Sequence, residues 1–179
     1  MTTSPSTIKL IVSDVDGVWT DGSIVYLGEQ REIKAFNVRD GLAVKLAQRV
    51  GLVVALITSR RSPALERRAR ELGITELRQG AVSKLDETER VAAKLGVTLD
   101  QILYAGDDLP DLAPMTRVAI SAAPADAAPE VLAAATWKLE TGGGRGAFRE
   151  LVERLLRERG DWDPLVQEFT IGKPEAQSI

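Results

Sequence analysis

Short apolar runs alternate along the chain with segments of helical period, and this alternation constrains the fold more than any other feature. The apolar runs, rich in β-branched residues, predict strands at residues 9–13, 52–57, 76–78, 102–105, 118–120 and 136–138. The segments between and after them predict helices at residues 41–50, 63–72, 84–95 and 147–158. Strands that alternate with helices are typical of βαβ units with a parallel sheet. The sequence therefore predicts an α/β protein with a Rossmann-like, doubly wound parallel sheet.

Capping residues support the ends of the predicted helices. Asp40 is a good N-cap for the first helix, and Ser62 precedes Pro63 at the first position of the second. A glycine follows each of the first three predicted helices, where a left-handed residue commonly ends a helix: Gly51, Gly73 and Gly96.

One segment after the first strand departs from the alternation. Residues 23–26 and 31–36 have strand character on either side of a loop at 27–30, so they predict a β-hairpin inserted after strand 1, within residues 22–36. A long connection at the carboxyl end of a sheet is more often functional than not, as a lid or an assembly surface. The alternative is a simple surface ribbon.

The chain contains no cysteine and no histidine, and this excludes several catalytic mechanisms and kinds of binding site. A disulfide scaffold, a thiolate nucleophile, a cysteine zinc site and the Ser-His-Asp and Cys-His mechanisms are all excluded. Acid–base chemistry near neutral pH must use carboxylates, lysine or bound water. Carboxylates are the first candidates.

Net charge and hydropathy limit the kinds of partner that we expect this chain to bind. A net charge of −3 and a pI of about 5.2 favour neither nucleic acid nor an anionic membrane as a partner. There is no signal-like apolar start and no run approaching the roughly 18 apolar residues of a membrane span. We therefore expect a cytoplasmic protein. Its length and composition predict a single domain at residues 1–160 and a non-helical tail at 161–179.

Two carboxylates, Asp14 and Asp16, directly follow the first predicted strand. Open α/β sheets bind ligands at the carboxyl ends of their strands. A D-x-D pair there can hold a divalent cation and can divide nucleophilic and acid–base work between its members. Acidic pairs are common in loops, so this interpretation needs support from elsewhere in the chain.

That support comes from the other strand ends. Thr58-Ser59-Arg60 follows the second long strand, Lys84 opens a helix after the short third strand, and residues 106–111, G-D-D-L-P-D, follow the fourth. In a parallel sheet these ends share one edge, where the side chains suit a phosphate held by threonine, lysine and Mg²⁺. Each residue has a structural explanation on its own, such as a strand-end or helix cap. Their joint appearance in this order favours a phosphate site.

These motifs resemble the four motifs of the haloacid dehalogenase superfamily: D-x-D-G-V at 14–18, Thr58, Lys84 and G-D-D-x-x-D. More narrowly, residues 34–41 and 143–150 resemble the capless 3-deoxy-D-manno-octulosonate 8-phosphate phosphatases. The similarity runs from about residue 8 to residue 156, and this subgroup also holds phosphatases of nine-carbon sugar acids. The resemblance implies a haloacid dehalogenase-like fold without a cap domain.

The resemblance also implies a reaction. The protein would be a Mg²⁺-dependent phosphomonoesterase that hydrolyses 3-deoxy-D-manno-octulosonate 8-phosphate, as in lipopolysaccharide biosynthesis, through an aspartyl-phosphate. Asp14 would be the nucleophile and Asp16 the acid and base. Mg²⁺ would be bound by Asp14, the backbone carbonyl of Asp16 and Asp107, with Asp108 close by.

Substrate contacts and assembly follow from the same resemblance. Thr58, the backbone near Ser59, and Lys84 would hold the phosphoryl oxygens. Arg60, Arg145, Lys34 and Asn37 would face the sugar acid, for which a guanidinium suits the carboxylate. The hairpin would build a homotetramer in which a neighbouring subunit covers each active site, and the tail either reaches an adjacent site or frays.

The sequence departs from the family's pattern at two places, and three alternative functions remain beside the predicted one. Ser59 stands where many relatives have glycine, and Gly142-Gly143-Gly144 is one glycine longer than the usual pair. The alternatives are a nine-carbon sugar-acid phosphatase, a phosphorylation-controlled receiver domain and a noncatalytic scaffold. Motif order argues against a receiver, because its lysine comes late in the chain, whereas Lys84 precedes the Asp107-Asp108 pair.

Overall fold

The computed structural model describes residues 4–28 and 32–172. Its main element is a parallel sheet of six strands in the order β5-β4-β1-β6-β7-β8. The strands are β1 (Leu10–Ser13), β4 (Val53–Thr58), β5 (Glu76–Gln79), β6 (Ile102–Ala105), β7 (Ile120–Ala123) and β8 (Trp137–Lys138). Because β1 lies between β4 and β6, the chain winds outward from the centre in both directions. The predicted doubly wound α/β fold is confirmed.

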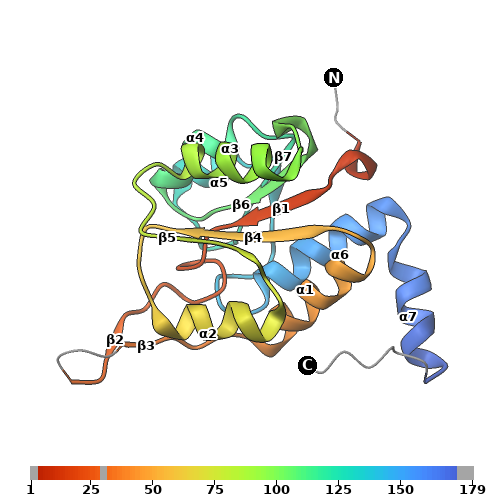
Figure 1. Ribbon diagram of the computed structural model, residues 1–179, viewed down its shortest axis with the longest axis horizontal. Coiled ribbons are helices and arrows are strands. Elements are labelled where there is room, and N and C mark those ends of the chain that lie inside the picture. Colours follow the sequence, from red (N-terminus) through yellow and green to blue (C-terminus); the bar gives the residue numbers. More distant parts are fainter. Residues whose placement is uncertain (1–3, 29–31, 173–179) are drawn as a thin grey trace.

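Helices cover both faces of this sheet (Figure 1). On one face lie α1 (Val38–Arg49), α2 (Pro63–Leu72) and α6 (Ala147–Arg159), and on the other α3 (Lys84–Leu95), α4 (Leu112–Met115) and α5 (Pro129–Ala134). A last helix, α7 (Trp162–Thr170), packs beside α6. Three short 3₁₀ helices complete the set: η1 (Pro5–Thr7), η2 (Leu99–Gln101) and η3 (Leu109–Asp111).

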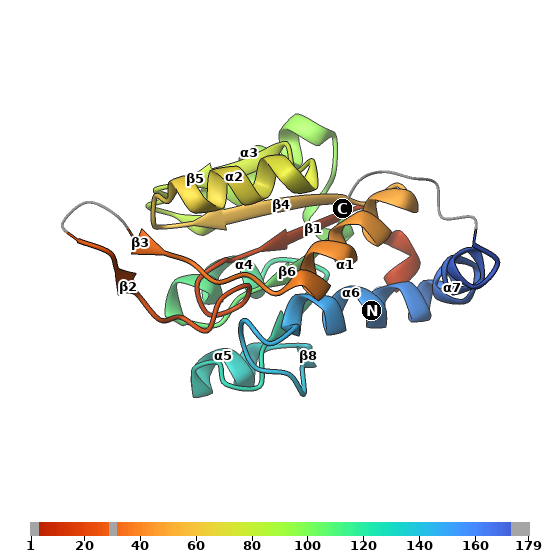
Figure 2. The ribbon, with the colours of Figure 1, turned by 90° about the horizontal axis from the view of Figure 1, so that it is seen from below.

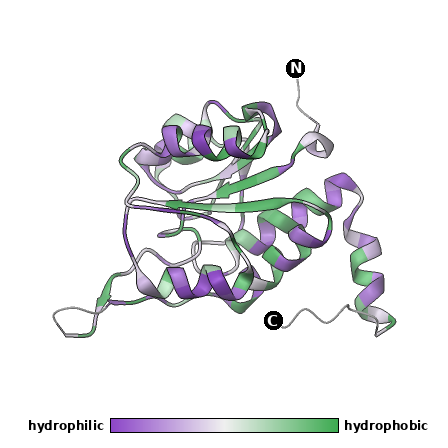
Figure 3. Ribbon diagram, in the orientation of Figure 1, coloured by the Kyte–Doolittle hydropathy of each residue, from purple (hydrophilic) through white to green (hydrophobic). Residues whose placement is uncertain are grey.

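The central strand β1 is buried on both faces. Leu10 and Val12 pack with the α3 side of the protein, whereas Ile11 between them packs with the α1 side. This alternation follows from the period of two in a strand, and it explains why β1 is apolar throughout instead of alternating with polar residues. Figure 3 shows β1 and β4 mostly in the green of hydrophobic residues, between helices whose turns alternate between green and the purple of hydrophilic residues.

The predicted helices 63–72 and 84–95 have the expected limits, but α1 begins at Val38, three residues before the predicted start. Its N-cap is Asn37, whose side chain accepts a hydrogen bond from Arg39 N at 2.9 Å. The predicted role of Asp40 as N-cap was therefore wrong. Asp40 is buried within α1 and accepts a hydrogen bond from Arg149 N, at the start of α6, at 2.7 Å.

Two further predictions were wrong. The strand predicted at 118–120 is β7, which starts only at Ile120, because Val118 N donates to Pro114 O and closes the turn after α4. The segment after residue 160 was expected to be non-helical, yet it forms α7, with Trp162 and Leu165 buried. Residues 173–179 of the predicted tail lie outside the described residues, and the domain limits stay a prediction.

The hairpin inserted after β1 is present but short. Its strands are β2 (Val25–Tyr26) and β3 (Glu32–Ile33), which pair antiparallel. Part of the predicted loop and residue 31 lie outside the described residues. Figure 2 shows the hairpin projecting past the ends of β1 and β4, on the side toward which the parallel strands run.

Membrane insertion was not expected from the sequence. Among the described helices, none is both long and apolar enough to cross a bilayer. The cytoplasmic location stays a prediction.

Candidate active site

Three carboxylates meet where β1 and β6 end. Asp14 follows β1, Asp107 lies two residues beyond β6, and Asp111 lies in η3; each offers an oxygen within 4.8 Å of the others. The backbone of Asp14 continues the sheet, since its N donates to Ala105 O at 2.9 Å. Neighbouring parallel strands therefore bring together residues more than 90 positions apart in the sequence, at the predicted edge.

Lys84, at the start of α3, joins this group. Its ammonium lies 3.0 Å from Asp14 Oδ2 and 2.8 Å from Asp111 Oδ1, and its side chain is only 6% exposed. Tyr104 also donates to Asp111 Oδ1, at 2.7 Å. Asp111 thus fixes the lysine that bonds Asp14. Asp111 is the last acidic residue of the G-D-D-x-x-D motif, and the sequence alone indicated no separate role for it.

Burial, together with neighbouring charges, shifts the pKa values in this group. Burial, opposed by Lys84 and reinforced by Asp111, raises the pKa of Asp14 from 3.8 to about 6. Burial and the charges of Asp14 and Asp111 raise the pKa of Asp107 to about 8. For Lys84, burial alone would lower the pKa, but Asp14 and Asp111 raise it. One lysine does not neutralise three carboxylates.

The three carboxylates fit a hard divalent cation. Asp107 Oδ1 is buried and has no hydrogen-bond partner among the described residues. Gly17, with φ +94°, leaves room for this side chain, since a Cβ there would lie 1.9 Å from Asp107 Oδ2. Carboxylate and carbonyl oxygens are the ligands that Mg²⁺ prefers in proteins. An added cation would both satisfy the unpaired oxygen and relieve the repulsion.

Asp108, predicted beside the metal, has a different environment. It is exposed, caps η3 by accepting a hydrogen bond from Leu109 N at 2.8 Å, and lies outside the group of three carboxylates. Its backbone N donates to Asp111 Oδ2 at 3.3 Å. Its contribution to metal binding stays a prediction.

A second group surrounds Asp16. Its Oδ1 pairs with Lys34, which comes from the segment after β3, and its Oδ2 accepts a 3.4 Å hydrogen bond from Thr58 Oγ1. Thr58 Oγ1 in turn accepts from Arg60 N at 3.1 Å. The structure therefore brings the predicted residues Asp16, Thr58 and Lys34 together, although they come from three separate segments. Ser59, between Thr58 and Arg60, is exposed.

Glu32, which belongs to none of the sequence motifs, completes this second group. Its Oε2 accepts a 2.6 Å hydrogen bond from Arg60 Nη2, and its Oε1 lies 3.8 Å from Lys34 Nζ. The hydrogen bond from Arg60 lowers the pKa of Glu32. Its position two residues before Lys34 in a predicted strand was the available signal, because both side chains then lie on one side of the ribbon.

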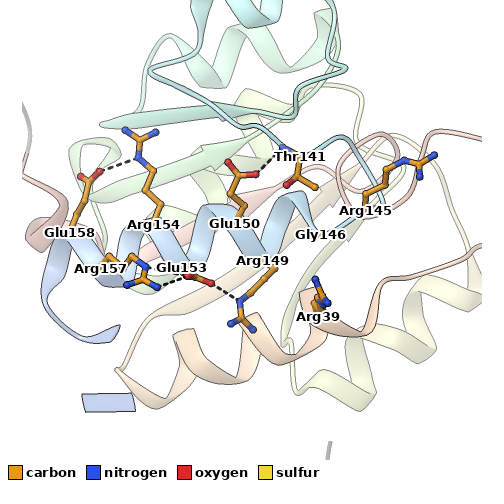
Figure 4. A pocket seen from close by; sticks show the side chains of 10 residues that line it. All are labelled: Arg39, Thr141, Arg145, Gly146, Arg149, Glu150, Glu153, Arg154, Arg157 and Glu158. Carbon is orange, nitrogen blue, oxygen red and sulfur yellow. Dashed lines mark hydrogen bonds and ion pairs between the residues drawn. The ribbon is translucent and has the colours of Figure 1, made fainter. Parts of the chain in front are cut away.

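Two predicted substrate residues lie elsewhere. The side-chain oxygen of Asn37 is occupied in capping α1. Arg145 is exposed and lines a cavity of about 550 Å³ along α6, together with Arg39 and Arg149 (Figure 4). None of the carboxylates that surround Asp14 lines this cavity. Roles for Asn37 and Arg145 in substrate binding stay predictions.

The extra glycine before Arg145 has a structural reason. The glycine loop packs backbone to backbone against the loop after β1: Gly144 N donates to Val18 O at 3.0 Å, and a Cβ on Gly143 would lie 2.0 Å from Gly17 O. Asp126 accepts a hydrogen bond from Gly143 N at 2.8 Å. The loop thus supports the segment that follows the nucleophile candidate.

Comparison with known proteins agrees with this geometry. Residues 64–146 match the haloacid dehalogenase-like hydrolase family. The 3-deoxy-D-manno-octulosonate 8-phosphate phosphatase KdsC of Escherichia coli K12 is 41% identical over 157 residues, covering 87% of this chain and 83% of the relative. The chain belongs to the 3-deoxy-D-manno-octulosonate 8-phosphate phosphatase family. The phosphatase of this name from Yersinia pestis is 45% identical over 150 residues, covering 83% and 80% of the two chains.

A solved structure from this phosphatase family extends the agreement to the fold. The enzyme from Moraxella catarrhalis, in complex with magnesium ion, phosphate ion and a KDO molecule, superimposes with a TM-score of 0.90 at 36% identity. The match covers 93% of this chain and 95% of that one. The predicted membership of the superfamily and of its capless phosphatases is confirmed.

Proposed function

We propose that this protein hydrolyses 3-deoxy-D-manno-octulosonate 8-phosphate to the free sugar acid and phosphate, with Mg²⁺ as cofactor. The observation that supports this most directly is the buried group of Asp14, Asp107, Asp111 and Lys84 in a member of this phosphatase family. The magnesium and phosphate ions in the related Moraxella enzyme support the same assignment.

Asp14 is the proposed nucleophile. One of its oxygens attacks phosphorus, the bond from phosphorus to the sugar oxygen breaks, and an aspartyl-phosphate forms. Asp14 is buried but keeps Lys84 at 3.0 Å, a cation that offsets the negative charge between an anionic nucleophile and an anionic phosphate. When bound, Mg²⁺ supplies Lewis-acid charge neutralisation at the same place.

Asp16 is the proposed acid and base. It gives a proton to the departing sugar oxygen and, as a carboxylate, then takes a proton from the water that hydrolyses the aspartyl-phosphate. Lys34 contacts one oxygen of this carboxylate and the Thr58 hydroxyl contacts the other, so the two contacts fix its orientation. Because one carboxylate serves as the acid in the first half-reaction and as the base in the second, this mechanism needs no histidine.

The remaining predicted residues are assigned to binding. Thr58, Ser59 and Lys84 hold phosphoryl oxygens. Asp14, Asp107 and the Asp16 carbonyl bind Mg²⁺, and Asp111 positions Lys84. Arg60, Lys34, Asn37 and Arg145 are proposed to face the sugar acid, with the contacts around Asp16 supporting the first two most directly.

The hairpin is the proposed assembly surface of a homotetramer. Five large apolar side chains on it are about half exposed or more: Ile24, Val25, Tyr26, Leu27 and Ile33. Exposed apolar groups of this density mark interaction sites. Light scattering of the purified chain tests the proposal, and a monomer at micromolar concentration would contradict it.

The decisive experiment on function measures phosphate release with Mg²⁺ from the eight-carbon substrate and, in parallel, from a nine-carbon sugar-acid 9-phosphate. We expect a kcat/KM of about 10⁴ M⁻¹s⁻¹ or more for the eight-carbon compound. It should be at least tenfold above that of the nine-carbon compound. A preference for the nine-carbon compound would change the substrate, and no release from either would contradict a phosphatase.

A further inference from the structure

The segment between β7 and α5, residues 124–128, binds two parts of the molecule at once. Ala128 N, at its end, donates to the backbone O of Asp107 at 2.8 Å. Two residues earlier, Asp126 Oδ1 accepts a hydrogen bond from Gly143 N at 2.8 Å. A single short segment therefore joins Asp107, the proposed metal ligand, to the glycine loop at residues 142–144.

Further contacts close a ring that includes Asp107. Its Oδ2 lies against Gly17, where a Cβ would come within 1.9 Å, and Gly17 O lies against Gly143, where a Cβ would come within 2.0 Å. Gly143 N then donates to Asp126, and the segment of Asp126 returns to Asp107 through Ala128. Closely packed groups transmit displacement to their neighbours. A shift of the glycine loop is therefore passed through Gly17 to the Asp107 carboxylate.

The glycine loop permits this close approach, but it needs anchors outside itself. Glycine loses more conformational freedom on ordering than any other residue, so three in a row are costly to hold in one conformation. The backbone supplies one anchor, the bond from Gly144 N to Val18 O at 3.0 Å. Among the described residues, Asp126 is the only one whose side chain is hydrogen-bonded to any of the three glycines. Gly142 leaves room for it, because a Cβ there would lie 2.7 Å from Asp126 Oδ2.

Asp107 depends on such support because it lies beyond the end of β6. Its backbone N donates to Asp111 Oδ2 at 3.2 Å, and its backbone O accepts from Ala128 N. Its carboxylate is placed by the contact with Gly17. Residues that orient a metal ligand without touching the metal commonly change the affinity by about 10–100-fold when they are substituted.

We propose that Asp126 is a positioning residue of the Mg²⁺ site. By binding Gly143 N, it keeps the glycine loop against Gly17 and thereby keeps the Asp107 carboxylate in place for the metal. Its effect is indirect, since the group of carboxylates that could share a cation consists of Asp14, Asp107 and Asp111. This inference rests on the proposed function, in which Asp107 binds Mg²⁺, and deepens it by naming a residue outside the superfamily motifs on which that site depends.

The test compares Asp126→Ala with Asp126→Asn. Alanine removes the acceptor of Gly143 N, whereas asparagine keeps a side-chain oxygen. The Kd for Mg²⁺ is obtained from the rise of Tm with Mg²⁺ concentration, on the full chain and without substrate. We expect this Kd to rise about tenfold in Asp126→Ala and to stay within about threefold in Asp126→Asn. Asp163→Ala, which removes an exposed carboxylate of α7, should bind Mg²⁺ like the unmodified chain.

A substitution in the glycine loop tests the same link from its other side. Gly142→Ala places a methyl group against Asp126 Oδ2, so the carboxylate must move. We expect the Kd for Mg²⁺ to rise about fivefold. In Asp126→Ala that carboxylate is absent, and adding Gly142→Ala should then raise the Kd by less than about twofold, because coupled sites are not additive.

Three results would overturn the proposal. If Asp126→Ala lowers Tm in chelator but leaves the Kd for Mg²⁺ unchanged, Asp126 only stabilises its loop. If Asp126→Asn raises the Kd as much as Asp126→Ala does, the charge matters and the hydrogen bond does not. Additive effects of Gly142→Ala and Asp126→Ala would show that the two residues act independently. Hydrolysis of the eight-carbon substrate by the unmodified chain tests the proposed function separately, because the Mg²⁺ titration uses no substrate.

Discussion

The carboxylate group of Asp14, Asp107 and Asp111 and the charged row of Arg60, Glu32, Lys34 and Asp16 lie near one another but are built differently. The first is held by neighbouring strands of the central sheet and by the start of α3, and the side chains of Asp14 and Asp111 are 8% and 0% exposed. The second depends on a hairpin with strands of two residues. Rigid elements thus hold the proposed nucleophile, whereas an insertion contributes Glu32 and Lys34 to the groups around the proposed acid and base, Asp16.

The two regions also differ in charge. In the first region three carboxylates surround one lysine, and burial, together with the charges of neighbouring carboxylates, raises the pKa values of Asp14 and Asp107. The second region balances two cations against two carboxylates. The first region therefore needs a cation, whereas the second is held together by its own ion pairs.

Substitution of Asp14 should have the largest effect. Asp14→Asn removes the attacking carboxylate at nearly constant shape, so we expect a loss in kcat of about 10⁴-fold or more. Phosphate release is the measurement, with Asp163→Asn on α7 as a control for the same chemical change. Activity within about 100-fold of the unmodified protein would contradict a covalent intermediate on Asp14.

Substitution of Asp16 should cost less. Asp16→Ala removes proton transfer but leaves the nucleophile, so we expect a loss of roughly 10²–10⁴-fold in kcat. An aryl phosphate with a good leaving group needs less acid assistance and should lose less in its first step. A loss below tenfold with the sugar substrate would assign the acid to another group.

Stability should depend on pH and Mg²⁺ through the first region. The folded, metal-free protein keeps protons on Asp14 and Asp107 up to about pH 6 and 8, whereas the unfolded chain loses them near 3.8. The folded state therefore binds more protons across this window, and its free energy of unfolding falls as the pH rises from about 4 to 8. We expect a metal-free Tm that falls over this window.

Mg²⁺ should oppose this fall. At about 100 times its Kd, it should raise Tm by roughly 5–10 °C, and more at pH 8 than at pH 5, because the ligands must lose their protons. Melts in chelator and in Mg²⁺ measure both effects. An Asp107→Asn variant that keeps the full Mg²⁺ stabilisation would place the metal elsewhere.

Substitution of Arg145 should have the smallest effect. Arg145 lines the cavity along α6, and no contact that joins it to Asp14 or Asp16 is present among the described residues. If it reaches the sugar acid, Arg145→Ala raises the KM of that substrate by about tenfold or less, with little change for an aryl phosphate. Arg117→Ala, on an exposed side chain, is the control. Equal effects on both substrates would make Arg145 a phosphate ligand or a structural residue.

Much of the fold could be predicted from local patterns. Two local signals were enough to predict α2 and α3. The helical period of the apolar residues lies within each helix, and Gly73 and Gly96 directly follow their last residues. The cap of α1 was misassigned, since Asp40 and Asn37 are equally good caps in isolation. Only packing against α6 commits Asp40 to Arg149 N. Likewise, α7 forms because Trp162 and Leu165 are buried at the end of α6, a contact that no local pattern records.

The sequence by itself determined the parallel α/β fold and the restriction of the chemistry to carboxylates and lysine. It also determined the strand ends near Asp14, Thr58 and Asp107 and the helix start at Lys84, because all of these follow from residue type and period. Only the tertiary structure decided which of those groups touch. It placed Asp111 against Lys84, Glu32 between Lys34 and Arg60, and Arg145 at a cavity along α6. Such contacts depend on strand register and on loops that approach from distant parts of the chain, and distances of this kind are not encoded in any local stretch of residues.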